Sequence, residues 1–252
     1  MDGKPLLARW VTNWDCGTET SWWECIREGP FSMDQLESTP RKHIRQALRK
    51  NTVLCCSITE ELAAQLFDIY AEAHMHYHNA DNRITKERFC ASLLNNRDSL
   101  EFYIAFNAEE KPVAYMNVIS HKGWASISSA KFNDEARKIG SSDALYYTVL
   151  DEYLNRRGMR YISSGERSIN HETGTQEYKE RVFRYRRAYS HLHIKYRWDV
   201  KLLITILYPV RKLFRKHDSN VRIHQLNALL FMEELHREDK NKDRKTDSSL
   251  IC

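Results

Sequence analysis

The residue types that a phosphate-binding turn needs occur together in residues 137–142, which read RKIGSS. Glycine lets the backbone approach a ligand closely, and a helix that begins beside it presents free N–H groups and the positive end of its dipole. The stretch follows three strand-like runs and precedes an amphipathic helix pattern. We therefore expect an anion-binding site made of Arg137, Gly140, Ser141 and Ser142, with an ordinary helix N-terminus as the alternative.

Two residues beyond the next strand-like run have side chains that can accept a proton. Glu166 follows the run 161–165 at its carboxyl end, where open α/β sheets bind their ligands. It could deprotonate an acceptor directly or through water. His171 is the competing base, because the unperturbed pKa of a histidine lies near neutrality. The alternatives are a solvated loop for both residues and, for Glu166, an ion pair with Arg167.

Three histidines at alternate positions could bind either a metal or a substrate. His74 and His78 lie four residues apart, so a helix would place them on one face as two zinc ligands. Asp81 is close in the sequence, but no nearby Cys or third His on that face completes the set, and we expect no metal. We expect His76 and Arg83 to contact an acceptor molecule. The alternative is a polar helix end for His76 and a side chain that lies along the surface for Arg83.

The elements that must position these residues follow from the period of the apolar residues. Three short strand-like runs in the middle of the chain are so close together that they require antiparallel hairpins. Helical and strand patterns alternate after them, which excludes an all-α or all-β protein. The expected order is a strand at 6–14, a helix at 41–50, a strand at 52–58, helices from about residues 60 and 85, strands at 100–106, 112–120 and 124–132, a helix from about 142 to 158, a strand at 159–164, a helix to about 187, a strand at 192–198 and two C-terminal helices.

The composition is that of an ordinary globular protein. The 252 residues are 42% hydrophobic and 29% charged, with a net charge of +5. Six cysteines without a CxxC pair favour reduced, packed thiols over a disulfide framework. The N-terminus lacks a basic-then-apolar leader pattern, and no apolar run is long enough to span a membrane. We expect a soluble, cytoplasmic protein.

The order strand, helix, helix, three-strand meander, helix, strand, helix, strand resembles the GNAT (Gcn5-related) N-acyltransferase fold. The resemblance covers roughly residues 40–198 and implies a single α/β domain with a mixed (α+β) sheet. One branch of this superfamily, the FemAB-like branch, includes enzymes that transfer amino acids from charged tRNA to peptidoglycan precursors and others that use acyl-CoA. The segments that resemble this branch are 41–50, 111–115, 144–147, 158–162 and 183–189.

The resemblance implies roles for several residues. The Arg-x-x-Gly-x-Ser spacing of residues 137–142 is close to the turn with which acyl-CoA-dependent N-acyltransferases bind a pyrophosphate. In the fold, two central parallel strands separate and expose backbone groups to the acyl carbonyl. A tyrosine on the helix before the next strand often protonates the leaving thiolate. Tyr185 is nearest to that position, Tyr178 and Tyr189 are the other candidates, and core packing is the alternative for each ring.

The expected function is N-acyl transfer from acyl-CoA, acetyl-CoA above all, to a small-molecule amine acceptor. Family analogy suggests an acceptor among cell-wall or surface-polysaccharide precursors. One alternative is an aminoacyl-tRNA-dependent aminoacyltransferase, because the basic segments 41–50 and 184–187 suit tRNA phosphates. The other alternative is a catalytically degenerate domain that only binds. Acyl-CoA is favoured because a single domain offers less surface to a large RNA.

The chain departs from the FemAB-like pattern in two ways. Full FemAB enzymes carry two such domains and usually a coiled-coil arm, whereas this chain has room for one. The familiar last strand is missing from the pattern, and C-terminal helices are expected in its place. The expected organisation is an N-terminal extension at 1–40, the GNAT-like domain at 41–198, helices at 199–236 and a disordered charged tail at 237–252.

One C-terminal segment, 202–216, combines an apolar face with Arg211, Lys212, Arg215 and Lys216. This combination suits peripheral contact with an anionic membrane. Packing of the apolar face against the sheet is the alternative.

Overall fold

The computed structural model describes residues 5–76, 84–169, 174–214 and 221–249. The chain divides into two compact units, each made of segments that are distant in the sequence. Two strands, β2 (Trp22–Glu28) and β8 (Arg186–Tyr196), contribute residues to both units. The larger unit comprises Ile26–Gly165 and Thr175–Arg186, and the smaller unit comprises Met1–Cys25, Glu166–Gly174 and Arg187–Cys252.

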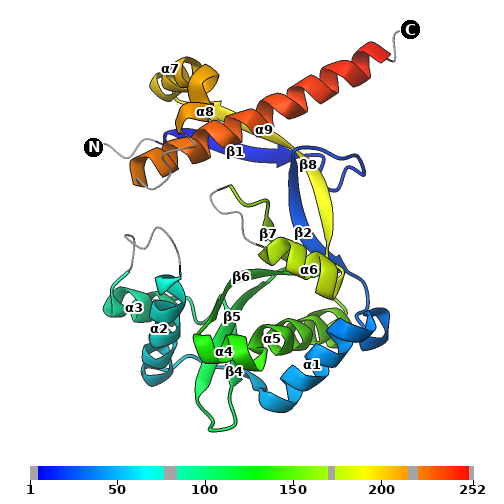
Figure 1. The fold of residues 1–252 in the computed structure, drawn as a ribbon, viewed down its shortest axis with the longest axis vertical. Coiled ribbons are helices and arrows are strands. Elements are labelled where there is room, and N and C mark those ends of the chain that lie inside the picture. Colours follow the sequence, from blue (N-terminus) through cyan, green and yellow to red (C-terminus); the bar gives the residue numbers. More distant parts are fainter. Residues whose placement is uncertain (1–4, 77–83, 170–173, 215–220, 250–252) are drawn as a thin grey trace. The chain divides into compact units, whose positions relative to one another are not determined.

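The strands form a mixed sheet in the order β1-β8-β2-β7-β6-β5-β4-β3 (Figure 1). Pairs β4–β5 and β5–β6 are antiparallel, as the closeness of the three central runs requires. The pair β3–β4 is also antiparallel, whereas β6 and β7 are parallel. The mixed α/β sheet that the sequence predicts is therefore confirmed. The remaining strands are β1 (Leu7–Thr12), β3 (Thr52–Cys56), β4 (Glu101–Phe106), β5 (Pro112–Ser120), β6 (Trp124–Phe132) and β7 (Tyr161–Glu166).

The place between β7 and β8 is filled by a strand from the start of the chain. We expected C-terminal helices in place of a missing last strand, and this expectation is wrong, because β2 lies there in the strand order. Most of β2 is buried, with Trp22 at 1% and Cys25 and Ile26 at 0% exposure. A near-continuous buried run suits a central strand that is covered on both faces. We expected no strand at 22–28, and the sequence of this segment does not reveal which distant strands are its partners.

The α-helices of the larger unit lie on both faces of its strands. They are α1 (Ser38–Lys50), α2 (Glu60–Met75), α3 (Lys86–Asn95), α4 (Asp134–Ile139), α5 (Ser141–Leu150) and α6 (Thr175–Phe183), with a short 3₁₀ turn, η1 (Met33–Gln35), before α1 and a π-helical segment, η3 (Asp151–Arg156), after α5.

Helices α2 and α3 cover one face of the strands. Each begins at a threonine that caps its first turn: Thr59 accepts from the N–H of Leu62 at 3.2 Å, and Thr85 accepts from the N–H of Arg88 at 3.4 Å. The apolar faces of both helices pack with side chains of β4 and β5. The buried residues of this core are Ile58, Ala63, Leu66, Ile69, Phe89, Leu93, Phe102, Ile104 and Tyr115.

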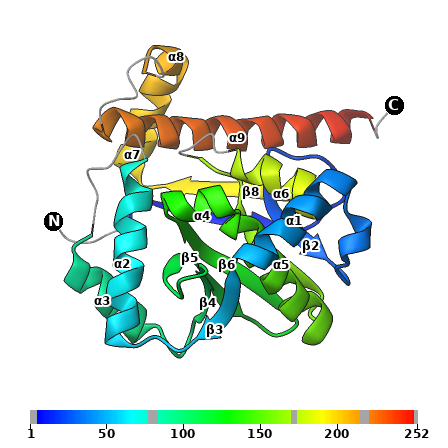
Figure 2. The same ribbon diagram turned by 60° about the horizontal axis from the view of Figure 1, so that its bottom comes forward.

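Helix α5 packs on the opposite face. Adjacent residues of a strand point to opposite sides: Phe102 joins the core under α2 and α3, whereas the ring of Tyr103 lies 6.0 Å from that of Tyr153 in η3. Figure 2 shows α5 and α1 together on this side of the strands, across from α2 and α3. The strands of the larger unit are therefore the middle of three layers.

The smaller unit is built around β1, β8 and a long helix, α9 (Val221–Ser249). Trp22, Leu192 and Leu235 form one of its cores. The ring N–H of His236 donates to the carbonyl of Leu192 at 2.8 Å, and Asp239 accepts from the N–H of Ser21 at 2.6 Å. The other helical elements of this unit are α7 (Trp198–Leu207), η4 (Tyr208–Val210) and α8 (Arg211–Phe214).

Residues 237–249, which the sequence predicts to be a disordered tail, form the last part of α9. A run of charged residues cannot fold alone, but a helix that is already docked extends at little cost. The start of the run is also anchored, because Asp239 is buried and Arg237 forms an ion pair with Glu233 at 2.6 Å, one turn earlier.

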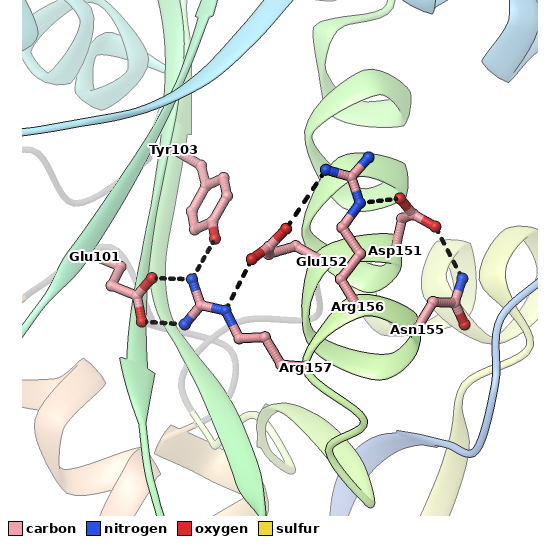
Figure 3. A network of polar contacts seen from close by, with 7 residues as sticks. All are labelled: Glu101, Tyr103, Asp151, Glu152, Asn155, Arg156 and Arg157. Carbon is pink, nitrogen blue, oxygen red and sulfur yellow. Dashed lines mark hydrogen bonds and ion pairs between the residues drawn. The ribbon is translucent and has the colours of Figure 1, made fainter.

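A charged network fixes the end of η3 to β4 (Figure 3). Arg157 donates two hydrogen bonds to the Glu101 carboxylate, at 2.6 and 2.5 Å, and one to Glu152 at 2.9 Å. Burial by itself would raise the pKa of Glu101. The hydrogen bonds from Arg157 and Tyr153, together with the positive charge of Arg157, outweigh burial and lower this pKa. The ionised carboxylate is thus the form that the fold stabilises.

Replacing Glu101 with glutamine should lower the free energy of unfolding by about 1–2 kcal/mol at pH 7, because the charge-assisted pair with Arg157 is lost. A lowered folded-state pKa contributes stability above the pKa of the unfolded chain, about 4.3, and that contribution is lost as the pH falls through the folded-state value. Denaturant unfolding should therefore show a difference between the two proteins at pH 7 that shrinks below about pH 4.

The control is Glu109→Gln, because Glu109 pairs with Lys111 at 3.0 Å but both side chains are about 70% exposed. Its effect should stay under about 0.5 kcal/mol at every pH. Equal effects of the two substitutions would contradict the role given to Glu101.

Candidate active site

Strands β6 and β7 are paired with each other at one end only. Residues 124–126 pair in parallel with residues 161–163, whereas β6 continues to Phe132 and β7 to Glu166. Over its remaining length β6 stays paired with β5, with a register shift at Asn117/Val118. Such irregularities bend a strand and increase its twist. In the described part of the chain, the carboxyl halves of β6 and β7 therefore diverge, as expected for the two central parallel strands.

The turn at 137–142 joins two helices that follow β6. Helix α4 ends at Gly140, whose left-handed φ of +78° favours glycine, and α5 begins at Ser141. The first intrahelical bonds of α5 run from the N–H groups of Asp143 and Ala144 to the carbonyl of Gly140. The amides of Ser141 and Ser142 precede these bonds, at the positive end of the α5 dipole.

Helix α1 holds this turn in place through Asn51, the residue that ends it. The Asn51 amide N–H donates to the carbonyls of Ala47 at 2.8 Å and Ile139 at 3.3 Å. The Ser141 hydroxyl donates to the Asn51 amide oxygen, and Ser141 is fully buried. What Ser141 can offer to a ligand is therefore its backbone amide, because its hydroxyl is committed to the fold.

Arg137 and His76, expected in different roles, meet at one carboxylate. Asp134 lies 3.3 Å from the guanidinium of Arg137 and 2.9 Å from Nε2 of His76. Its own N–H donates to Glu72 of α2 at 2.7 Å. All three side chains of the Asp134 cluster are about half exposed, with 53% for Asp134, 45% for Arg137 and 46% for His76. The end of α2 and the first turn of α4 are thereby brought together.

Helix α6 links the start of α5 to the diverging end of β7 through two consecutive residues. The Tyr178 hydroxyl donates to the carboxylate of Asp143, in the first turn of α5. The ammonium of Lys179 donates to the carbonyl oxygen of Ser164 in β7 at 3.1 Å and also to its hydroxyl. The anion-binding turn and the diverging strand end therefore both lie within reach of α6.

The Tyr178–Asp143 pair holds its proton firmly. Burial raises the pKa of Asp143, and the hydrogen bond from Tyr178 and the electrostatic effect of His43 oppose this rise. Burial also raises the pKa of Tyr178, and the negative charge of Asp143 adds to the effect. The tyrosine hydroxyl therefore stays protonated at neutral pH.

Neither Asp143 nor Lys179 was expected in the site. The sequence carries one signal for Lys179: it precedes the apolar Phe183 by four residues, so that a helix places both on one face. In the structure both side chains are buried. A lysine at a buried helix position needs polar partners. Which groups supply them depends on the tertiary structure.

Tyr185 lies outside the helix on which it was expected. We expected a helix to about Arg187, but α6 ends at Phe183 and Arg184 has a left-handed φ of +55°. Pairing of β8, which starts at Arg186, overrides the helical pattern of this segment. Tyr185 itself is buried at 4% exposure, and its ring lies 6.5 Å from that of Tyr146 on α5. Tyr189 belongs to β8 rather than to the helix.

Glu166 is the last residue of β7 and belongs to the smaller unit. Its carboxylate accepts a hydrogen bond from Arg9 at 2.7 Å, rather than pairing with its neighbour Arg167 in the way we considered. The guanidinium of Arg9 also lies over the Trp22 ring, 4.9 Å from its centre. Glu166 therefore sits in a defined polar environment at the carboxyl end of its strand.

Two expected site residues, Arg83 and His171, lie outside the described residues, as do His78 and Asp81, which we considered as metal ligands. Among the described residues, no group of three or more His, Cys, Asp and Glu side chains is arranged to hold a metal ion. None of the helices in the described ranges is both long and apolar enough to cross a membrane.

A family model described as an acetyltransferase (GNAT) domain matches residues 38–180. This match covers more than half of the chain, which therefore belongs to the GNAT family of acyltransferase enzymes. The recognition of the GNAT superfamily from the sequence is confirmed, as is the class of enzyme. No curated protein sequence matches the chain.

Solved structures share the fold at low sequence identity. L-PGS from Bacillus licheniformis is 14% identical with a TM-score of 0.52, over 78% of this chain and 65% of that one. The C-terminal domain of a lysylphosphatidylglycerol synthetase from Agrobacterium fabrum, described as putative, is 16% identical with a TM-score of 0.51, over 80% and 66%. FemX is 11% identical with a TM-score of 0.48, over 69% and 60%. The chain thus spans about two thirds of the length of the first two.

Replacing Gly140 with alanine should lower the free energy of unfolding by about 2 kcal/mol, as measured by denaturant unfolding. One part of the cost, about 1 kcal/mol, comes from the left-handed backbone. The rest comes from packing, because an added Cβ would lie 3.3 Å from the Cβ of Ala47 in α1.

Gly123→Ala is the matched control. Gly123 has a similar φ of +83°, but nothing lies within 4 Å of an added Cβ. The free energy of unfolding of this variant should therefore fall only by the backbone contribution, about 1 kcal/mol. If both variants lost the same stability, close packing of the turn on α1 would not be a constraint.

Proposed function

We propose that the protein transfers an acyl group from acyl-CoA to the amine of a small-molecule acceptor. The observation that supports this proposal is that consecutive residues of α6 bond to two separate structural features. One is the glycine turn at the start of α5, which Tyr178 reaches through Asp143. The other is the diverging end of β7, which Lys179 reaches through Ser164. A phosphate-bearing donor needs the first feature and a reacting carbonyl needs the second.

The donor's pyrophosphate would bind at the turn. The backbone amides of Ser141 and Ser142 supply donors at a helix N-terminus, and Arg137 supplies a positive charge within the same six residues. The N–H of Gly140, which we expected to be a third donor, already donates to the carbonyl of Ala136. Arg137 already pairs with Asp134 in an exposed ion pair, which contributes little by itself. The guanidinium can therefore exchange that partner for a phosphate at small cost.

The reaction needs one bond made, one bond broken and two proton transfers. The acceptor nitrogen attacks the thioester carbonyl, whose oxygen is stabilised by backbone N–H groups exposed where β6 and β7 diverge. The carbon–sulfur bond then breaks, and Tyr185 gives its proton to the leaving thiolate. The proton of the acceptor nitrogen passes to Glu166, directly or through water. His76, Arg83 and His171 are proposed to contact the acceptor.

The acceptor is proposed to be a cell-wall or surface-polysaccharide precursor that carries an amine. An aminoacyl-tRNA donor is the second candidate, because the basic segments 41–50 and 184–187 suit tRNA phosphates. One solved structure with a similar fold is a lysylphosphatidylglycerol synthetase domain, described as putative, but at 16% identity this likeness concerns the fold alone. The two donors differ in size and charge, so that a binding measurement separates them.

Isothermal titration should show binding of CoA and of acetyl-CoA, and Arg137→Ala should weaken both by about tenfold because a charge-assisted phosphate contact is removed. The control is Arg156→Ala, an exposed arginine that pairs with Asp151 at 3.1 Å, which should leave the affinity unchanged. Salt-sensitive binding of tRNA without binding of any CoA would reverse the choice of donor. Binding of neither would leave the domain without the proposed activity.

Tyr185→Phe should lower turnover by about two to four orders of magnitude while the affinity for acetyl-CoA stays almost unchanged, because only the acidic hydroxyl is removed. Turnover is measured as thiol release from acetyl-CoA in the presence of amino-sugar acceptors. Tyr189→Phe in β8 is the control and should be close to wild type. Near-normal turnover in a folded Tyr185→Phe protein would make Tyr185 a packing residue and direct the same test to Tyr178.

A further inference from the structure

The segment of the smaller unit that comprises α7, η4 and α8 carries an unusual amount of exposed apolar surface. Helix α7, η4 and α8 lie next to one another along the chain (Figure 1). Their exposed apolar surface consists of Trp198 at 78%, Leu202 at 57%, Leu203 at 47%, Ile206 at 62%, Val210 at 41% and Leu213 at 63% exposure.

This surface is not the face by which α7 packs on its own unit. Val200 and Ile204 are buried against Leu230 of α9. Trp198, Leu202 and Ile206 recur every four residues, so that they share a different face of α7. Helix α7 is thus apolar on two sides, and the described residues cover only one of them. Our alternative explanation for the apolar residues, packing within the fold, accounts for Val200 and Ile204 but not for the exposed set.

The charges beside the exposed apolar surface are mostly positive. Lys201 and Lys212 are exposed, and neither forms an ion pair with a described residue. The single carboxylate within α7, η4 and α8, Asp199, is bound by Arg197 at 2.7 Å, which neutralises it. Arg211 of α8 is in turn paired with Glu234 of α9 at 3.1 Å, so that the two lysines carry the unpaired positive charge among the described residues of this segment. Arg215 and Lys216, which we expected to add to the charge, lie outside the described residues.

We propose that this surface, formed by α7, η4 and α8, docks the protein on an anionic membrane. Apolar side chains on one helix face would enter the boundary between headgroups and acyl chains, while the lysines beside them would meet the anionic headgroups. An exposed tryptophan suits this boundary, because its ring is apolar and its N–H is polar. A second copy of the chain fits less well, since a two-fold axis through the surface would bring its own lysines together. The inference does not depend on the proposed acyl transfer.

The test is co-sedimentation of the full chain with vesicles of phosphatidylglycerol and phosphatidylcholine in equal parts, and with vesicles of phosphatidylcholine alone. The protein should bind the anionic vesicles and bind the neutral ones much more weakly. Leu202→Ser with Ile206→Ser should raise the lipid concentration for half-binding by at least about tenfold. Lys201→Glu with Lys212→Glu should reduce the preference for anionic vesicles.

A matched control comes from exposed apolar residues of the larger unit. Leu54→Ser with Met75→Ser changes side chains of similar exposure, 51% and 61%, and should bind like wild type. All variants should keep the wild-type melting temperature, because the changed side chains are exposed. Equal binding to neutral and anionic vesicles, no binding at all, or a dimer in solution that Leu202→Ser with Ile206→Ser dissociates would each overturn the proposal.

Discussion

The short pairing of β6 with β7 is the constraint on which the rest of the larger unit depends. Parallel hydrogen bonding stops after residues 126 and 163, and the two strands then follow different courses. Backbone polar groups that lose a partner must find another or meet a ligand. The Lys179 ammonium satisfies one such group, the carbonyl of Ser164 in β7. A buried lysine at this point thus stabilises a divergence that a continuous sheet would not contain.

Helix α5 is held at both ends, which gives the turn before it a defined position. At its start, Asn51 of α1 binds Ser141, and Tyr178 of α6 binds Asp143. At the far end, beyond η3, Arg157 binds Glu101 of β4. A helix N-terminus is a useful anion site only when it does not move relative to the reacting groups, because small displacements cost much of the rate. The polar contacts of α5 thereby serve placement as well as stability.

The proposed acyl transfer and the proposed membrane contact lead to one common expectation about the acceptor. A protein held at an anionic surface meets membrane-associated molecules at a high local concentration, without any improvement in its intrinsic affinity. An amine-bearing precursor that is anchored in a membrane would therefore be a better acceptor than a free one. The two proposals rest on different residues, so that each can fail without the other.

The sequence by itself determined the order of most elements, the mixed sheet and the glycine turn, because these follow from local periodicity and from the conformational freedom of Gly140. It did not predict β2 or the short helix α4. Tertiary structure decided what local patterns do not contain. It placed β2 beside β7, ended α6 at Phe183 because β8 pairs from Arg186, and continued α9 through residues that look disordered alone. It also brought Lys179 to Ser164 and Arg9 to Glu166. These contacts join residues far apart in the chain, and a long-range partner leaves no periodic signal in the sequence around either residue.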